Sequence, residues 1–108
     1  MNHKLQILNF LGWLIDGDIA ITNTGEILKL STINFENDSN FQNVVIDHIE
    51  NMGYSVNTFS TYLAGHEKPL YYTVIETKKG IEIVSTDFNT SRQYATYEGI
   101  CDFLNNLI

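Results

Sequence analysis

Cysteine, proline and basic side chains are all scarce in this chain. Its 108 residues include one cysteine, one proline and six Lys or Arg, against thirteen Asp or Glu. A single cysteine excludes an intramolecular disulfide and a cysteine-rich zinc site. Too few cations are present to neutralise the phosphates of a nucleic acid or of an anionic membrane, so neither is an expected direct partner. The net charge of −7 instead favours a protein partner, and a basic one would suit it.

Long hydrophobic runs are also missing. No window approaches the roughly 18 apolar residues of a membrane-spanning helix. The amino-terminal apolar stretch is interrupted by Gln6, Asn9 and Gly12, and it lacks the apolar core of a signal peptide. We therefore expect a cytoplasmic protein. A length of 108 residues with 44% hydrophobic content predicts a single domain, residues 1–108, with one core.

The hydrophobic period changes early in the chain. Apolar residues at helical spacing predict a short helix over residues 4–12. Strict alternation from Ile15 to Thr22 then predicts one strand with a solvated face. Turn residues over 22–26 join this strand to a second one that contains Leu28 and Leu30, which makes a hairpin.

The rest of the chain predicts two more helices and three more strands. A helix begins after the polar cluster 35–40 and ends at Gly53, strands follow at 54–63, 70–77 and 81–83, and a last helix runs from the cap at 89–91 to Leu107. On the second helix the predicted apolar face consists of Phe41, Val44, Val45, Ile49 and Met52. The order α-β-β-α-β-β-β-α predicts an α+β fold, with an antiparallel sheet of about five strands packed with three helices.

The strand predicted at 54–63 has apolar residues on both sides. Tyr54 and Val56 lie on one face, and Phe59 and Leu63 lie on the other. This change of side predicts either a sheet covered on both faces or a bulge partway along the strand.

Residues that commonly carry catalysis are isolated in this sequence. His3, His48 and His66 do not pair at a metal-ligand spacing, and the spacing of Cys101 places it on the core face of the last helix. His66 and Glu67 form either a base with its orienting carboxylate or an ordinary solvated loop pair. The seven glycines are scattered singly, so no phosphate-cradling loop is present. We predict no catalytic residue, cofactor or metal.

Carboxylates are the more informative polar residues. Asp16 and Asp18 are predicted on one strand face, about 7 Å apart by strand rise, where they would bind a divalent cation or simply face solvent. Glu36 and Asp38 lie in a loop rich in oxygen ligands, but they lack the spacing of an EF-hand, and helix capping explains them better.

Six tyrosines offer a second kind of binding residue. Tyrosine buries a large area at low entropic cost and is enriched at interface hot spots. Tyr71 and Tyr72 are adjacent in a predicted strand and must face opposite sides, so one of the two can be exposed for binding. The alternative is that all six are ordinary half-buried residues.

Three segments carry a resemblance to a known family. They are Leu11-Gly12-Trp13, Ile33-Asn34-Phe35-Glu36-Asn37-Asp38 before the second helix, and Asn89-Thr90-Ser91 before the last helix. In their order and in the elements they open or close, they resemble the phage ABA sandwich domain proteins. The resemblance covers most of the chain and implies a phage or prophage origin in a bacterial host cell, where small acidic proteins often disarm host enzymes. It transfers no catalytic residue.

These observations together predict a small, acidic, non-enzymatic protein that binds and inhibits a host protein. A basic nuclease of a nucleic-acid-directed defence system is the expected target, because carboxylates would occupy its channel in place of phosphates. The residues expected to bind the partner are Asp16, Asp18, Glu36, Asp38, Asp47, Glu50, Tyr71 and Tyr72.

Two alternatives to this function remain open. The first is a module that sequesters a small ligand or nucleotide, across a homodimer interface in one version, which would require Lys78, Lys79 and Arg92 to converge on the phosphates. The second is a phage structural or assembly protein.

Overall fold

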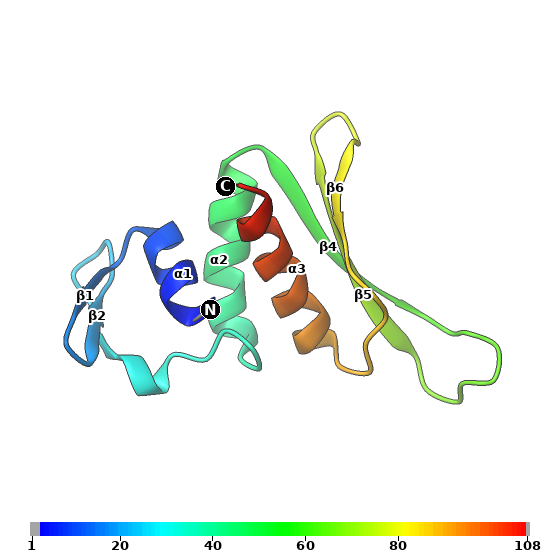
Figure 1. The fold of residues 1–108 in the computed structure, drawn as a ribbon, viewed down its shortest axis with the longest axis horizontal. Helices are drawn as coiled ribbons and strands as arrows, with labels where there is room; N and C mark the ends of the chain where they lie inside the picture. Colours follow the sequence, from blue (N-terminus) through cyan, green and yellow to red (C-terminus); the bar gives the residue numbers. More distant parts are fainter. Residues whose placement is uncertain (1–2, 108) are drawn as a thin grey trace.

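The structure, a computed structural model, describes residues 3–107 as three α-helices and two three-stranded sheets (Figure 1). The elements are α1 (His3–Leu11), β1 (Leu14–Asp16), β2 (Ile19–Ile21), β3 (Ile27–Lys29), the 3-10 helix η1 (Leu30–Thr32), α2 (Ser39–Asn51), β4 (Tyr54–Thr61), β5 (Leu70–Thr77), β6 (Glu82–Ser85) and α3 (Arg92–Asn106). The predicted α+β class and its three helices are confirmed. The prediction of about five strands in one sheet is wrong, because six strands form two separate sheets.

The helices lie between the two sheets. The first sheet has the order β1-β2-β3 and the second has the order β4-β5-β6, and both are antiparallel throughout. In Figure 1 the first sheet stands at one end of the long axis and the second sheet at the other, with α1, α2 and α3 packed together between them. The molecule is therefore elongated, with extents of 48 × 32 × 23 Å.

The first sheet contains one more strand than the alternating pattern predicts. Residues 15–22 are not one strand, because Gly17 has a φ of 61° and turns the chain back on itself. Asp16 pairs with Ile19 across this turn, and a positive φ at the first central residue alone is typical of a type II′ hairpin. Asp16 and Asp18 therefore flank a turn and do not share a strand face, which corrects the prediction for this pair.

The helix ends follow the predicted capping residues. The Asp38 carboxylate accepts a hydrogen bond from the backbone N–H of Asn40 at 2.9 Å and caps α2. Gly53 follows α2 with a φ of 102°, a conformation that only glycine adopts without strain. The Ser91 hydroxyl accepts a hydrogen bond from the N–H of Tyr94 at 3.2 Å and caps α3. These local predictions are confirmed.

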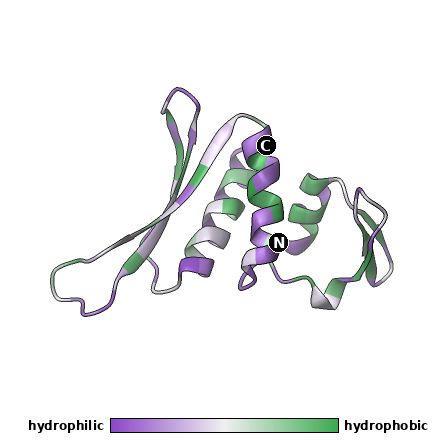
Figure 2. Cartoon of the chain, turned by 180° about the vertical axis from the view of Figure 1, so that it is seen from behind, coloured by the Kyte–Doolittle hydropathy of each residue, from purple (hydrophilic) through white to green (hydrophobic). Residues whose placement is uncertain are grey.

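One hydrophobic core joins the helices to both sheets. Its buried members are Ile7, Leu8 and Leu11 of α1, Ala20 of β2, Ile33 and Phe35 before α2, Val45 and Ile49 of α2, Ile75 and Val84 of the second sheet, and Ile100, Phe103 and Leu104 of α3. Figure 2 shows hydrophobic (green) stretches on the helices and in both sheets, and a hydrophilic (purple) tip on the β5–β6 hairpin. Val44 and Met52 are exceptions to the predicted face of α2, since their side chains are 39% and 46% exposed.

The second sheet meets α3 through small polar residues. Thr58 and Thr73 are register partners, and the Thr58 hydroxyl lies 2.7 Å from the hydroxyls of both Thr73 and Thr96. Gly99 of α3 packs on Thr73, so closely that a Cβ on Gly99 would lie 2.6 Å from the Thr73 methyl group. Gly99 thus allows α3 to approach β5.

The other face of the second sheet is open and aromatic. Phe59 and Tyr72 are register partners with ring centroids 5.4 Å apart, and Phe88 meets Tyr72 edge-on at 5.6 Å. Phe59 and Phe88 are exposed. Both views show the three helices on one side of the second sheet (Figures 1 and 2). Thr58 and Thr73 face α3 on that side, so strand alternation turns Phe59 and Tyr72 to the other. The apolar residues of β4 do change sides, but β4 pairs with β5 without a bulge. The register shift lies instead between Ile75 and Glu76 against β6.

Candidate functional site

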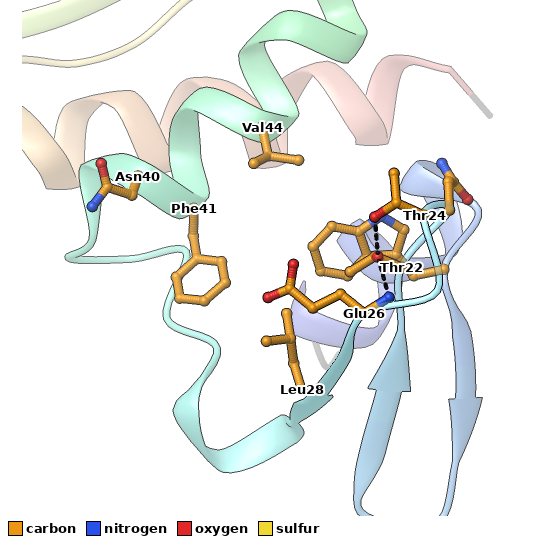
Figure 3. Close-up of a pocket in the computed structure, with 9 residues that line it drawn as sticks. Thr22, Thr24, Glu26, Leu28, Asn40, Phe41 and Val44 are labelled. Carbon is orange, nitrogen blue, oxygen red and sulfur yellow. Dashed lines mark hydrogen bonds between the residues drawn. The ribbon is translucent and has the colours of Figure 1, made fainter.

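A pocket of about 420 Å³ lies between the first sheet and α2. Its volume is within the range of small-molecule sites, about 300–1,000 Å³. Figure 3 shows that one wall comes from α2 and the other from the end of β2, the following turn and β3. The lining residues are Trp13, Thr22, Asn23, Thr24, Glu26, Leu28, Asn40, Phe41 and Val44.

The end of α1 positions Trp13 against the pocket. The N–H of Gly12 donates to the carbonyl of Asn9 at 3.1 Å, and the N–H of Trp13 donates to the carbonyl of Leu8 at 3.1 Å. This pair of bonds is a Schellman motif, which needs a left-handed residue at Gly12, whose φ is 76°. The Asn23 side chain donates to the carbonyl of Leu11 at 3.2 Å and ties the turn to the same helix end.

The turn after β2 fixes the position of Glu26. The Thr22 and Thr24 hydroxyls share a hydrogen bond of 3.0 Å, and the Thr22 hydroxyl also accepts from the N–H of Glu26 at 3.1 Å. The N–H of Thr22 donates to the carbonyl of Glu26 at 2.9 Å. With its backbone held in this way, Glu26 extends its carboxylate toward α2, into the space beside Phe41 and below Val44 (Figure 3).

The wall from α2 is mostly hydrophobic. Asn40 and Phe41 both lie on the side of Val44, because they precede it by four and three residues on the helix. Phe41 is held from behind by an edge-to-face contact with buried Phe35, whose ring centroid lies 5.9 Å away. Across the pocket, Leu28 points toward Phe41 (Figure 3). The pocket is therefore an apolar cleft that contains one carboxylate.

Negative charge is concentrated in the half of the chain that builds this pocket. Residues 1–66 contain seven acidic residues and two basic residues, Lys4 and Lys29, a net charge of −5. Residues 67–108 contain six acidic and four basic residues, a net charge of −2. Within residues 3–107, the Glu26 carboxylate forms no hydrogen bond or ion pair with the protein, since the contacts of this residue come from its backbone. Its charge is thus available to a ligand.

The six acidic residues expected to bind a partner lie on three separate elements. Asp16 and Asp18 are exposed at the β1–β2 turn, at the opposite end of the first sheet from Glu26. Asp47 and Glu50 are exposed on the later turns of α2. The structure spreads these four over one half of the molecule and does not bring them to one point.

The loop before α2 holds the remaining two acids. Asp38 caps the helix and is partly buried. Glu36 is exposed and lines a second, more polar pocket of about 320 Å³ with Lys4, Ser31, Ile33, Asn34, Phe35 and Tyr97. The Lys4 ammonium donates to the carbonyl of Leu30 at 2.9 Å in this pocket.

Tyr71 and Tyr72 face opposite sides of β5, as predicted. Tyr71 lies on the helix side, where the Arg92 guanidinium is 4.8 Å from its ring centroid. Tyr72 belongs to the aromatic cluster on the open face of the second sheet, with Phe59 and Phe88. Both tyrosines are half-buried.

The cations required for nucleotide binding are far apart. Arg92 contacts Tyr71 near the start of β5 and donates to the carbonyl of Thr58 at 3.3 Å. Lys78 and Lys79 follow the other end of β5, about 20 Å away at the usual strand rise. Lys78, Lys79 and Arg92 therefore do not converge on one point, as a phosphate site would require.

Elsewhere in residues 3–107, side chains that could carry chemistry are scattered or buried. Within residues 3–107, no group of three or more His, Cys, Asp or Glu side chains is placed to hold a metal ion. His48 stacks edge-on against Phe10 at 4.7 Å. Cys101 is buried, and burial raises the pKa of its thiol to about 11. In the same range of residues, none of the helices has the length and hydrophobicity needed to cross a bilayer.

Three residues that define the pocket were not predicted as site residues. Trp13, Glu26 and Phe41 come from a helix end, a turn and a second helix, so their meeting depends on tertiary packing. The turn over 22–26 was the available signal, because it marks where the chain presents Glu26.

Comparison with known proteins gives no match: no family model, no curated protein and no solved structure matches this chain.

Proposed function

We propose that this protein is a non-enzymatic binding domain whose acidic half docks on a basic protein. The observation that carries the proposal is the segregation of charge, with a net charge of −5 in residues 1–66 against −2 in residues 67–108. Exposed carboxylates at the β1–β2 turn and on α2 present this charge to solvent. Complementary charge of this kind steers association and selects partners of opposite sign.

The basic surface that best suits the acidic half is the nucleic-acid channel of a partner enzyme. Such channels are lined by Lys and Arg that neutralise phosphates, and carboxylates can occupy the same cations. A domain bound there would exclude nucleic acid and inhibit the enzyme. The resemblance to phage proteins supports a nuclease of a host defence system as the target. We include this target in the proposal.

The proposal is tested by charge reversal in two matched variants. The first changes Asp16, Asp47 and Glu50 to Lys, and the second changes Glu67, Glu82 and Asp87 to Lys. All six residues are exposed, and three reversals change the net charge equally in both variants. The first set avoids Asp38, whose loss would also remove a helix cap.

The measurement is capture of proteins from a bacterial lysate at low and high salt, quantified by mass spectrometry. We expect wild type and the second variant to capture the same basic partner at low salt, and the first variant to capture at least tenfold less. If both variants lost capture of the partner equally, net charge alone would explain the loss, and this result would contradict a docking face. Undiminished capture by the first variant would also contradict the proposal.

A further inference from the structure

We infer that the pocket between the first sheet and α2 binds a lysine side chain of the protein partner. This inference rests on the proposed function, since it assigns a particular contact to the acidic half. It adds a specific ligand chemistry, an alkylammonium group, to what is otherwise a diffuse electrostatic attraction.

The walls of the pocket suit the hydrocarbon stem of lysine. Leu28, Phe41 and Val44 present apolar surface from both sides, and the Val44 side chain is 39% exposed. Trp13 completes the lining with a second aromatic ring. Aromatic rings attract cations through their negative faces, most strongly when the cation is partly desolvated. A lysine inserted here would bury its methylene groups and keep its charge beside two rings.

The polar groups of the pocket suit the ammonium group. Glu26 extends its carboxylate into the cleft, and within residues 3–107 that carboxylate has no protein partner. The Thr22 and Thr24 hydroxyls and the Asn40 side chain line the same space and can accept further hydrogen bonds. An ammonium has three donors to satisfy, whereas a guanidinium has five in a fixed plane. A single carboxylate with a few hydroxyls matches the smaller cation.

The charge of Glu26 is not neutralised by the nearest cation along the chain. Glu26 and Leu28 both line the pocket, and alternation along β3 turns Lys29 to the other side of the strand. An anionic ligand would meet an unpaired carboxylate in an apolar setting and is excluded on this ground. A neutral apolar ligand would leave that carboxylate desolvated. A cation with an apolar body is the ligand class that satisfies both parts of the pocket.

The test uses small probes that separate charge from shape. n-Butylammonium, n-butylguanidinium, n-butanol and butyrate are titrated into the full chain, with binding followed by the fluorescence of Trp13 and by backbone amide chemical shifts. Trp13 is the only tryptophan, so its emission reports on the pocket itself. We expect n-butylammonium to bind at least tenfold more tightly than n-butanol or butyrate. Tighter binding of n-butylguanidinium, or equal binding of the alcohol, would overturn the inference.

Two variants assign the binding to Glu26. Glu26→Gln keeps the shape of the side chain, removes its charge, and is expected to weaken n-butylammonium binding about tenfold. Glu67→Gln makes the same change of net charge in the exposed loop between β4 and β5 and is expected to have no effect. Equal weakening by both would overturn the inference.

Different results would contradict the lysine pocket and the acidic docking face. If charge reversal on Asp16, Asp47 and Glu50 abolishes partner capture while Glu26→Gln leaves both capture and amine binding unchanged, the acidic docking face stands and the lysine pocket is wrong. If n-butylammonium binds in a Glu26-dependent manner but capture does not depend on the acidic half, the pocket stands as an amine site and the docking face is wrong.

Discussion

Gln42 connects three parts of the chain through one side-chain amide. The amide nitrogen donates to the carbonyls of Phe35 and Gln93 at 2.8 Å and to that of Glu36 at 3.2 Å. Gln42 is 3% exposed, so these carbonyls would otherwise be buried with fewer partners. The loop before α2 and the start of α3 are thus held by a residue whose side chain could equally have faced solvent.

Replacing Gln42 by Met tests this role. Met preserves length and volume but cannot donate, so the carbonyls lose their partner, and we expect a loss of about 1–3 kcal/mol in the free energy of unfolding. The measurement is urea denaturation followed by circular dichroism. The matched control is Asn43→Met, at an exposed position next to Gln42 on α2, which is expected to change stability by less than about 0.5 kcal/mol. An equal change in the free energy of unfolding in both variants would show that the Gln42 hydrogen bonds do not stabilise the fold.

Cys101 gives a second prediction at the residue scale, based on its pKa. Burial raises that pKa to about 11, and nearby carboxylates, that of Asp102 foremost, add to the rise. An unfolded chain ionises its thiol near the reference value of about 8.5. Native protein at pH 8 should therefore react with iodoacetamide at least about a hundredfold more slowly than protein unfolded in guanidinium chloride. Fast native modification at pH 8 would contradict the buried position.

The same difference in pKa links the thiol to stability. The folded pKa lies above the unfolded one, so the thiol's contribution is fully present below about pH 8.5 and is lost as pH rises toward 11. The native modification rate should rise over the same interval. Burial also raises the pKa of the adjacent Tyr97, which acts in the same direction at still higher pH.

At the scale of secondary-structure elements, α3 approaches β5 closely at Gly99. Gly99 has an ordinary helical backbone, so alanine would be expected to favour the helix by about 1 kcal/mol on propensity alone. Its new Cβ would instead lie 2.6 Å from the Thr73 methyl group. We expect Gly99→Ala to lower the free energy of unfolding by about 1–3 kcal/mol, measured by urea denaturation.

A second substitution identifies the cause of that loss. Thr73→Ser removes the methyl group that the new Cβ would meet and keeps the hydroxyl that lies 2.7 Å from the Thr58 hydroxyl. In the Thr73→Ser background, Gly99→Ala should therefore cost less than it does alone. A stabilised Gly99→Ala protein would mean that α3 and β5 lie farther apart.

Helix ends were predictable from the sequence because their causes are local. Asp38, Gly53 and Ser91 cap helices through bonds or backbone angles that involve only neighbouring residues. The β1–β2 hairpin was missed because Gly17 lies two residues from both Ile15 and Ile19 and so continues their alternating pattern. In the hairpin Ile15 pairs with Ala20 and Asp16 pairs with Ile19, so Ile15 and Ile19 face opposite sides of the sheet, and the positive φ of Gly17 marks the reversal.

At the scale of the whole molecule, the number of sheets and the pocket were not predictable from local pattern. The sequence identified the strands after α2 well, but nothing local determines whether β3 pairs with β4 or whether helices separate them. The pocket has the same origin, because Glu26 and Phe41 meet only when the first sheet is placed against α2. Of the six acidic residues predicted to bind a partner, all but Asp38 are exposed, whereas the uneven distribution of charge along the chain was overlooked.

The separation of the two sheets has a consequence for how this protein can evolve. Most residues of the buried core belong to the helices, whereas β1 and β3 contribute no buried core residue and Asp47 and Glu50 of α2 are exposed. Exposed substitutions away from the core usually change stability by less than about 0.5 kcal/mol. Carboxylates such as Asp16 and Glu50 can therefore be exchanged for other side chains with little effect on folding. A lineage under pressure from a changing partner could alter its binding end many times and still keep the same fold.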